Sequence, residues 1–103
     1  MAVDIPEVWC RFGIMVHQDF LLEYDGVFLG FASVVKELPA NDINVLYLFL
    51  SEIQAAALST WEKALLWEKS GAEIFVVGEE VHSFFSKLLE TVENCRQSKS
   101  QAP

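Results

Sequence analysis

The chain of 103 residues is 52% hydrophobic, and its 15 Asp and Glu residues outnumber seven Lys and Arg residues, which gives a formal charge of −8. These values exclude intrinsic disorder over most of the length and predict one domain, because two cores would each be too small to fold alone. No apolar run approaches the roughly 20 residues that cross a bilayer, and so acidic a surface repels nucleic-acid phosphates and acidic lipids. We therefore expect no direct contact with DNA, RNA or a membrane. A basic protein partner is favoured, and acidity that serves only solubility is the alternative.

The first 16 residues lack the basic start, apolar middle and small-residue cleavage site of a secretion signal, so we expect a cytoplasmic protein. Cys10 and Cys95 lie near opposite ends of the chain. In a cytoplasmic setting, two reduced thiols are expected rather than a disulfide. Neither cysteine has a Cys or His at the spacing of a metal site, and we expect no cofactor.

Apolar periodicity predicts the first elements of the chain. Residues 7–16 are apolar enough for a helix or for an extended segment, and the pattern does not separate the two. From Asp25 onward, apolar residues recur at spacings of one, three and four up to Leu38, which predicts an amphipathic helix. Pro39 ends this helix, because the residue before a proline disfavours the helical backbone conformation.

The next two helices are predicted from their caps as well as from their apolar faces. Asn41 or Asp42 can cap a helix over 43–57 by accepting hydrogen bonds from its free backbone N–H groups. One face of that helix carries Val45, Leu46, Phe49, Leu50, Ile53 and Ala57. A further helix is predicted over 59–70, since its first four residues, Ser-Thr-Trp-Glu, have the pattern of a capping box. Gly71 follows where a left-handed C-cap is needed.

The last helix has the clearest pattern. Apolar residues follow the helical period without interruption at Val81, Phe84, Phe85, Leu88, Leu89 and Val92. Acidic residues at its start and Arg96 near its end match the helix dipole. Residues 72–77 are a short apolar run, and we favour a connector over a strand because a lone strand would have no partner. The sequence thus predicts an all-α fold, a single-domain bundle of four to five helices with short loops over residues 1–96, and a flexible polar tail over 97–103.

The two histidines and their neighbours are the candidates for catalytic or metal-binding residues. His17 and Asp19 could form an acid–base pair, but no nucleophile accompanies them. His82 lies beside the apolar face of the last helix, where a half-exposed histidine is ordinary. A metal could be held by His17, Asp19 and Glu23 across a turn, yet the chain has no helical His-x-x-x-His pattern and no paired cysteines. Since there is also no glycine-rich phosphate loop and no nucleophile elbow, we predict neither an enzyme nor a metal site.

The segment around Asp19 is better explained as a structural element. The Asp19 carboxylate can accept hydrogen bonds from backbone N–H groups at the start of a helix. Phe20 and Tyr24 are four residues apart, so on a helix they share one face and can dock the amino-terminal segment on the core. Glu23 and Asp25 are then expected to face solvent.

The same segment carries a family resemblance. It consists of His17-Gln18-Asp19-Phe20 followed by Glu23-Tyr24, and behind it come a long helix, a second helix with a leucine-rich face and a closing amphipathic helix with Phe84-Phe85. This arrangement resembles the contact-dependent growth inhibition immunity proteins that open with a His-Gln-Asp-(Trp/Phe)-x-x-Glu-Tyr element. The resemblance covers about residues 12–93; the opening element is moderately specific, and the rest matches in pattern and length. The chain departs from the family at Phe20, where Trp is usual, and its second and third tryptophans have no counterpart that we can align.

The resemblance implies a function. In these systems a cell delivers the toxic carboxyl-terminal domain of a large surface protein into its neighbours, and the producer keeps a small cytoplasmic protein that binds and blocks its own toxin. Many of these toxins are nucleases, which are usually basic, so a charge of −8 would favour the complex. The implied protein performs no reaction of its own.

The toxin-binding surface is predicted from acidic residues and one tryptophan. The predicted contacts are Glu23, Asp25, Asp42, Trp67, Glu68, Glu73, Glu79 and Glu80. Glu79 and Glu80 are favoured first because they begin a helix beside a connector. Trp61 and Trp67 are six residues apart and cannot both lie on the central apolar stripe, so one of them is expected to be an exposed anchor. Two alternative functions remain open: an acidic adaptor or nucleic-acid mimic that inhibits another basic protein, and a small enzyme that uses the first histidine and its neighbouring aspartate.

Overall fold

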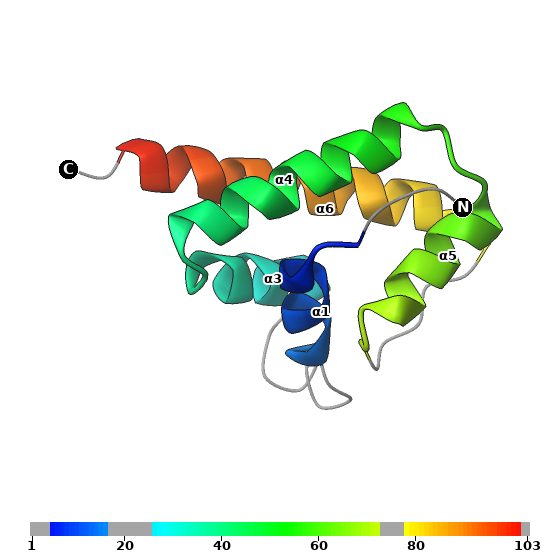
Figure 1. Ribbon diagram of the computed structural model, residues 1–103, viewed down its shortest axis with the longest axis horizontal. Helices are drawn as coiled ribbons and strands as arrows, with labels where there is room; N and C mark the ends of the chain where they lie inside the picture. The colour runs from blue at the N-terminus through cyan, green and yellow to red at the C-terminus, as the bar shows by residue number, and fades with distance from the viewer. Residues whose placement is uncertain (1–4, 17–25, 73–77, 102–103) are drawn as a thin grey trace.

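Five α-helices and no strand make up the part of the chain that the computed structural model describes, which is residues 5–16, 26–72 and 78–101. The helices are α1 (Glu7–Ile14), α3 (Val27–Lys36), α4 (Ala40–Ala55), α5 (Thr60–Lys69) and α6 (Glu80–Gln101) (Figure 1). The prediction of an all-α, single-domain bundle of four to five helices is confirmed.

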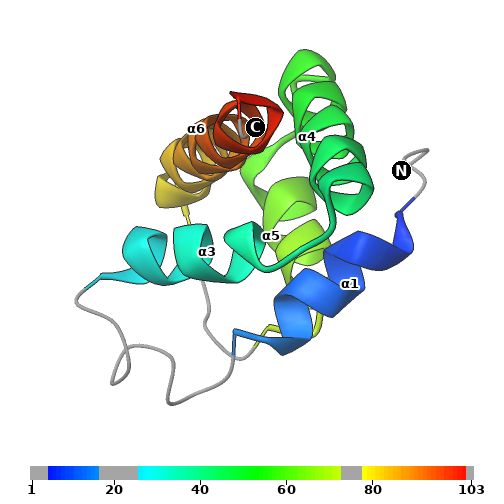
Figure 2. The same cartoon turned by 90° about the vertical axis from the view of Figure 1, so that its left-hand side faces the viewer.

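The two longest helices, α4 and α6, lie side by side along the long axis of the molecule (Figures 1 and 2). Helix α6 also packs against α3 and α5, and α1 packs against α4. In Figure 2, α4 and α6 lie at the top, α3 and α1 lie below them, and α5 lies farther from the viewer. Because α6 contacts three other helices, its uninterrupted apolar stripe forms the centre of the bundle.

An aromatic cluster around Trp9 fills the core. The Trp9 ring centroid lies 5.3 Å from that of Phe49, 5.7 Å from that of Trp67 and 6.0 Å from that of Phe85. Its indole Nε1 donates a hydrogen bond of 2.8 Å to the backbone oxygen of Leu66 on α5, so the polar atom of this buried side chain is satisfied. Trp9 therefore joins α1 to α4, α5 and α6 through both packing and a hydrogen bond.

Residues 7–16, for which the sequence left two possibilities open, begin as helix α1. Helix α4 begins earlier than predicted, since it starts at Ala40 with Pro39 at its N-cap and no side-chain cap hydrogen bond. The predicted caps, Asn41 and Asp42, lie inside the first turn instead, so that prediction was wrong. Helix α4 also ends earlier: Ala57, predicted on its buried face, is exposed and has a left-handed backbone (φ 52°). Neither Gly nor Asn occupies this turn, so the residue types there do not indicate a helix end.

Two predicted boundaries of α5 are confirmed. Ser59 and Glu62 form the reciprocal capping box, and Gly71 adopts the left-handed conformation (φ 85°) just past the carboxyl end. Helix α6 continues to Gln101, so it ends later than predicted and includes most of the polar segment that was expected to be a tail. The predicted connector over 72–77 lies mostly outside the described residues. The Sγ atom of Cys10 donates to the backbone oxygen of Lys69, and that of Cys95 donates to the backbone oxygen of Ala32, each over 3.7 Å.

Candidate functional site

Several residues predicted to contact a toxin, and the whole family element, lie outside the described residues. They are His17, Gln18, Asp19, Phe20, Glu23, Tyr24, Asp25 and Glu73.

Asp42 is engaged within the chain. Its carboxylate lies 3.1 Å from Nη2 of Arg11, and the side chain is only 18% exposed. The same guanidinium lies 3.9 Å from the Glu7 carboxylate, one helical turn away on α1. Asp42 thus ties the first turn of α4 to α1, and this contact explains why its carboxylate does not cap its own helix. Its predicted role as a toxin contact would require that ion pair to open.

The prediction for Trp67 was wrong. This side chain is 2% exposed, and its ring centroid lies 4.8 Å from that of Phe84 and 5.9 Å from that of Phe31. A partner cannot reach it in the folded protein. The expectation that one of the two tryptophans is exposed is nevertheless confirmed, because Trp61 is 71% exposed. Six residues correspond to about 600° of helical rotation, which is about 120° short of two full turns, so the two indoles point to different sides of α5.

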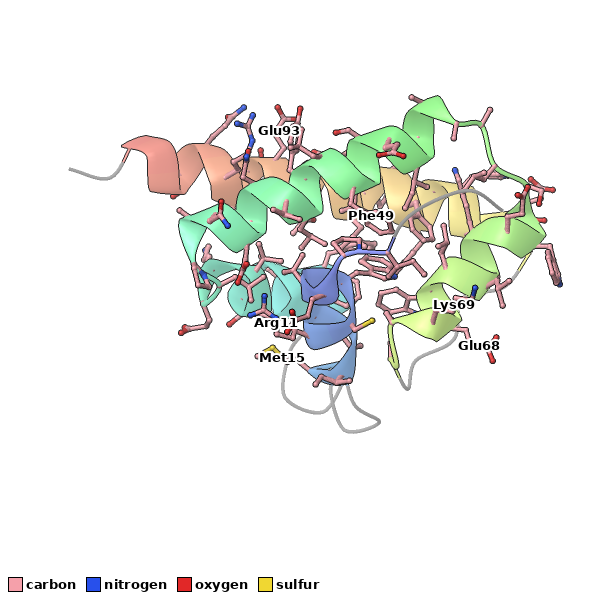
Figure 3. All side chains as sticks on the ribbon, viewed as in Figure 1. Arg11, Met15, Phe49, Glu68, Lys69 and Glu93 are labelled. Carbon is pink, nitrogen blue, oxygen red and sulfur yellow. The ribbon has the colours of Figure 1, made fainter. Side chains whose placement is uncertain are left out.

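The remaining predicted contacts face solvent. Glu80 is the first residue of α6 and Glu79 immediately precedes it; both are exposed, and the Glu79 side chain is 92% exposed. Glu68 is exposed in the last turn of α5, and Figure 3 shows it at the outer edge of that helix, whereas Phe49 points into the bundle. Since α5 is ten residues long, Glu68 lies about 10 Å along the helix axis from its first turn.

A buried lysine, which the sequence analysis missed, joins three helices. Lys63 on α5 is 5% exposed, and its Nζ donates hydrogen bonds to Gln54 Oε1 on α4 (3.2 Å) and to His82 Nδ1 on α6 (3.1 Å). Burial lowers the pKa of the Lys63 ammonium below its ordinary value. The sequence does carry a signal for this contact, because Lys63 precedes Leu66 and Trp67 by three and four residues and so lies on the buried face of α5.

The hydrogen bond from Lys63 also orients His82. Since an ammonium can only donate, Nδ1 of His82 is the acceptor in this contact. The other ring nitrogen, Nε2, lies 4.0 Å from the carboxylate of Glu79, which immediately precedes α6. The buried lysine therefore links the first turn of α5 to the first turn of α6. Figure 1 shows the two helix starts at the same end of the molecule.

The two helix starts carry three acids, Glu62 on α5 and Glu79 and Glu80 at the start of α6, which we call the acidic corner. Glu62 belongs to the capping box: its Oε1 accepts a hydrogen bond from the Ser59 backbone N–H (3.1 Å), and its own N–H donates to Ser59 Oγ (3.2 Å). The hydrogen bonds from Ser59 lower the pKa of the Glu62 carboxyl, so it is ionised at neutral pH. The corner thus presents carboxylates from two helix starts at one end of the molecule.

A second surface feature has a different character. A groove of about 390 Å³ runs between α3 and α6. It is lined by Phe28, Leu29, Ala32, Lys36, Thr91, Asn94, Cys95 and Ser98. This lining holds one cation and no carboxylate, so a basic partner is favoured at the acidic corner and not at this groove.

Within the described part of the chain, no three His, Cys, Asp or Glu side chains come close enough to hold a metal ion. The same residues include no helix with the length and apolar character needed to span a bilayer. No protein family model, curated protein or solved structure matches this chain.

Proposed function

We propose that this protein is an immunity protein of a contact-dependent growth inhibition system, which binds the cognate carboxyl-terminal toxin domain and neutralises it. The proposed toxin is a basic nuclease. The carboxylates of the immunity protein would fill its phosphate-binding cleft or bind beside the cleft and exclude the substrate. The protein itself would act by binding, in the cytoplasm, without a cofactor.

The placement of charges on the described residues carries this proposal. Three of the cations make contacts inside the chain: Lys63 is buried, Arg11 pairs with Asp42, and the Arg96 guanidinium lies 4.3 Å from the Tyr47 ring centroid. Glu79, just before α6, and Glu80, its first residue, are exposed, and Glu79 lies 4.0 Å from His82. Because Lys63 is buried, fewer cations than the seven in the sequence are left at the surface to balance the 15 acids.

An acidic surface suits a protein that must reach its target before the target acts. Complementary charge raises association rates towards 10⁸–10⁹ M⁻¹s⁻¹, roughly a hundredfold or more above the rate for neutral surfaces. A standard interface covers about 800 Å² on each partner. The molecule, with extents of 41 × 31 × 22 Å, offers faces large enough for such a patch.

The direct test is co-expression with the toxin domain encoded by the gene immediately upstream. We expect the two proteins to co-purify and cells that express both to survive, whereas cells that express the toxin alone die. An acidic adaptor or nucleic-acid mimic of another kind would leave those cells dead. Death of the co-expressing cells, with the protein present and folded, would refute the proposed function.

Charge reversal then tests which surface of this protein binds the toxin domain. Replacing Glu79 and Glu80 by Lys should slow association with the toxin domain about tenfold at low salt and weaken protection, because both carboxylates are exposed at the start of α6. The matched control replaces Glu37 and Glu52, which are exposed on α3's carboxyl end and on α4, and changes the net charge by the same amount. Equal effects of both pairs would mean that only the overall charge matters.

A further inference from the structure

Lys63 is a buried cation whose hydrogen-bond partners carry no negative charge. The side chain is 5% exposed, and its Nζ is hydrogen-bonded to Gln54 Oε1 on α4 and to His82 Nδ1 on α6. Nζ also lies 6.0 Å from the centroid of the Phe85 ring. Among the described residues, no carboxylate lies within ion-pair distance of Lys63. Because a buried ammonium needs acceptors, the contact with His82 matters to the stability of the fold.

The contact of 3.1 Å between Nζ of Lys63 and Nδ1 of His82 depends on protonation. A hydrogen bond between two nitrogens needs a donor and an acceptor, and an ammonium that faces an imidazolium finds no acceptor. The contact therefore exists only while one of the two facing nitrogens is unprotonated. In the unfolded chain, both side chains are protonated below about pH 6.5, the ordinary pKa of histidine. The unfolded state thus binds more protons there, so this contribution to stability falls as the pH falls.

Two charged side chains in the described part of the chain contact His82, and they act in opposite directions. Lys63 on α5 opposes an imidazolium, whereas the Glu79 carboxylate, 4.0 Å from Nε2, favours it. The Glu79 side chain is 92% exposed, so water and salt screen its charge, but Lys63 is buried. Helix α4 contributes the uncharged Gln54. The repulsion from Lys63 is therefore the larger effect.

We infer that the contact between Lys63 and His82 is a pH-sensitive latch, which holds the first turn of α6 on α5 at neutral pH and opens when the pair takes up a proton in mild acid. His82 lies in that first turn, whereas the residues of α6 that enter the core farther along, such as Phe85 and Leu88, are apolar and do not titrate. Mild acid should therefore loosen the start of α6 first. The latch does not depend on the proposed function.

The test compares the pH dependence of unfolding in the wild type, His82→Gln and Lys63→Met. The Gln amide oxygen can accept a hydrogen bond from Lys63 but takes up no proton, and Met keeps an apolar chain without the charge. From about pH 8 to about pH 5, the equilibrium constant for unfolding of the wild type should rise about tenfold more than that of either variant. Urea denaturation at each pH measures it. The other titrating groups are common to all three proteins, so the difference isolates the pair.

Each outcome decides for or against the latch. Equal pH dependence in all three proteins would overturn it. A pH dependence that disappears in His82→Gln but persists in Lys63→Met would overturn it too, because the imidazole would then titrate without regard to the lysine. NMR of the wild type is a second measurement that needs no variant to fold. The side-chain signals of Lys63 should shift together with those of the His82 imidazole as the pH falls, and Lys63 signals that stay constant would show that no latch opens.

Discussion

The two ends of α5 each carry a tryptophan, and the two side chains have opposite surroundings. Near the carboxyl end, Trp67 is 2% exposed and its ring lies within 6.3 Å of the rings of Trp9, Phe12, Phe31 and Phe84. In the first turn, Trp61 is 71% exposed and precedes Glu62, whose carboxylate is ionised. One short helix thus serves as a core element at its end and presents a candidate binding surface at its start.

The difference shows that residue type alone did not decide the role of these two tryptophans. The neighbours that pack on each turn decided it. Helix α1 crosses the end of α5, where Trp9 donates its hydrogen bond to the oxygen of Leu66, and this contact closes the core over Trp67. At the start of α5, the buried contact is made by Lys63 instead, and Trp61 is left on the outer side.

Replacing Trp67 by Ala should have the largest effect on stability. The substitution removes the ring that contacts four other aromatic rings and leaves a cavity that the helices around it cannot fully close. We expect the free energy of unfolding to fall by about 3–5 kcal/mol, a loss that can unfold a domain of this size. Urea denaturation followed by far-ultraviolet circular dichroism measures it. A loss below about 1 kcal/mol would mean that Trp67 is not part of the packed core.

Gly13 tests the same end of α5 from the side of α1. A methyl group added at Gly13 would overlap the backbone oxygen, Cβ and Oγ of Ser70, so the two helix ends must move apart. We expect Gly13→Ala to destabilise the protein by about 1–3 kcal/mol. The sign of the change is decisive: without this close contact, Ala in place of Gly inside a helix would stabilise the protein by up to about 1 kcal/mol. Thermal and urea denaturation of the purified variant report the sign.

The start of α5 should be less sensitive, and its sensitivity should depend on pH. Replacing Ser59 by Ala removes one half of the capping box and should cost about 1 kcal/mol at neutral pH. The pKa of the Glu62 carboxyl is lowered from 4.5 in the folded protein by its hydrogen bonds with Ser59. The contribution of the ionised Glu62 to the free energy of unfolding is therefore fully present above pH 4.5 and is lost as the pH falls through the lowered pKa.

The difference in unfolding free energy between the wild type and Ser59→Ala should accordingly shrink in acid. Urea denaturation of both proteins at pH 7 and at successively lower pH measures this difference. A difference that stays constant, or that grows in acid, would mean that the ionised form of Glu62 does not support the cap.

Local patterns in the sequence predicted the helices well, because apolar periodicity and the capping box depend on residues a few positions apart. The errors concern contacts between distant residues. Asp42 is drawn to Arg11 on another helix and so does not cap its own. The sequence showed that Trp61 and Trp67 belong to different sides of α5, but the choice between them depends on where α1 crosses. Lys63 lay on the apolar stripe of α5, and its partners on α4 and α6 could not be read from local spacing.

Replacing Trp61 by Ala should have the smallest effect on stability. Its indole makes no ring contact among those that connect the core aromatics, and most of its surface already faces water. We therefore expect the unfolding free energy to change by less than about 0.5 kcal/mol, in contrast to the effect at Trp67. Acrylamide quenching gives an independent measure: of the three tryptophans, Trp61 should be the one that the quencher reaches, so Trp61→Phe should remove most of the quenchable fluorescence. If quenching persists in that variant, or if Trp61→Ala unfolds the protein, the indole is part of the core.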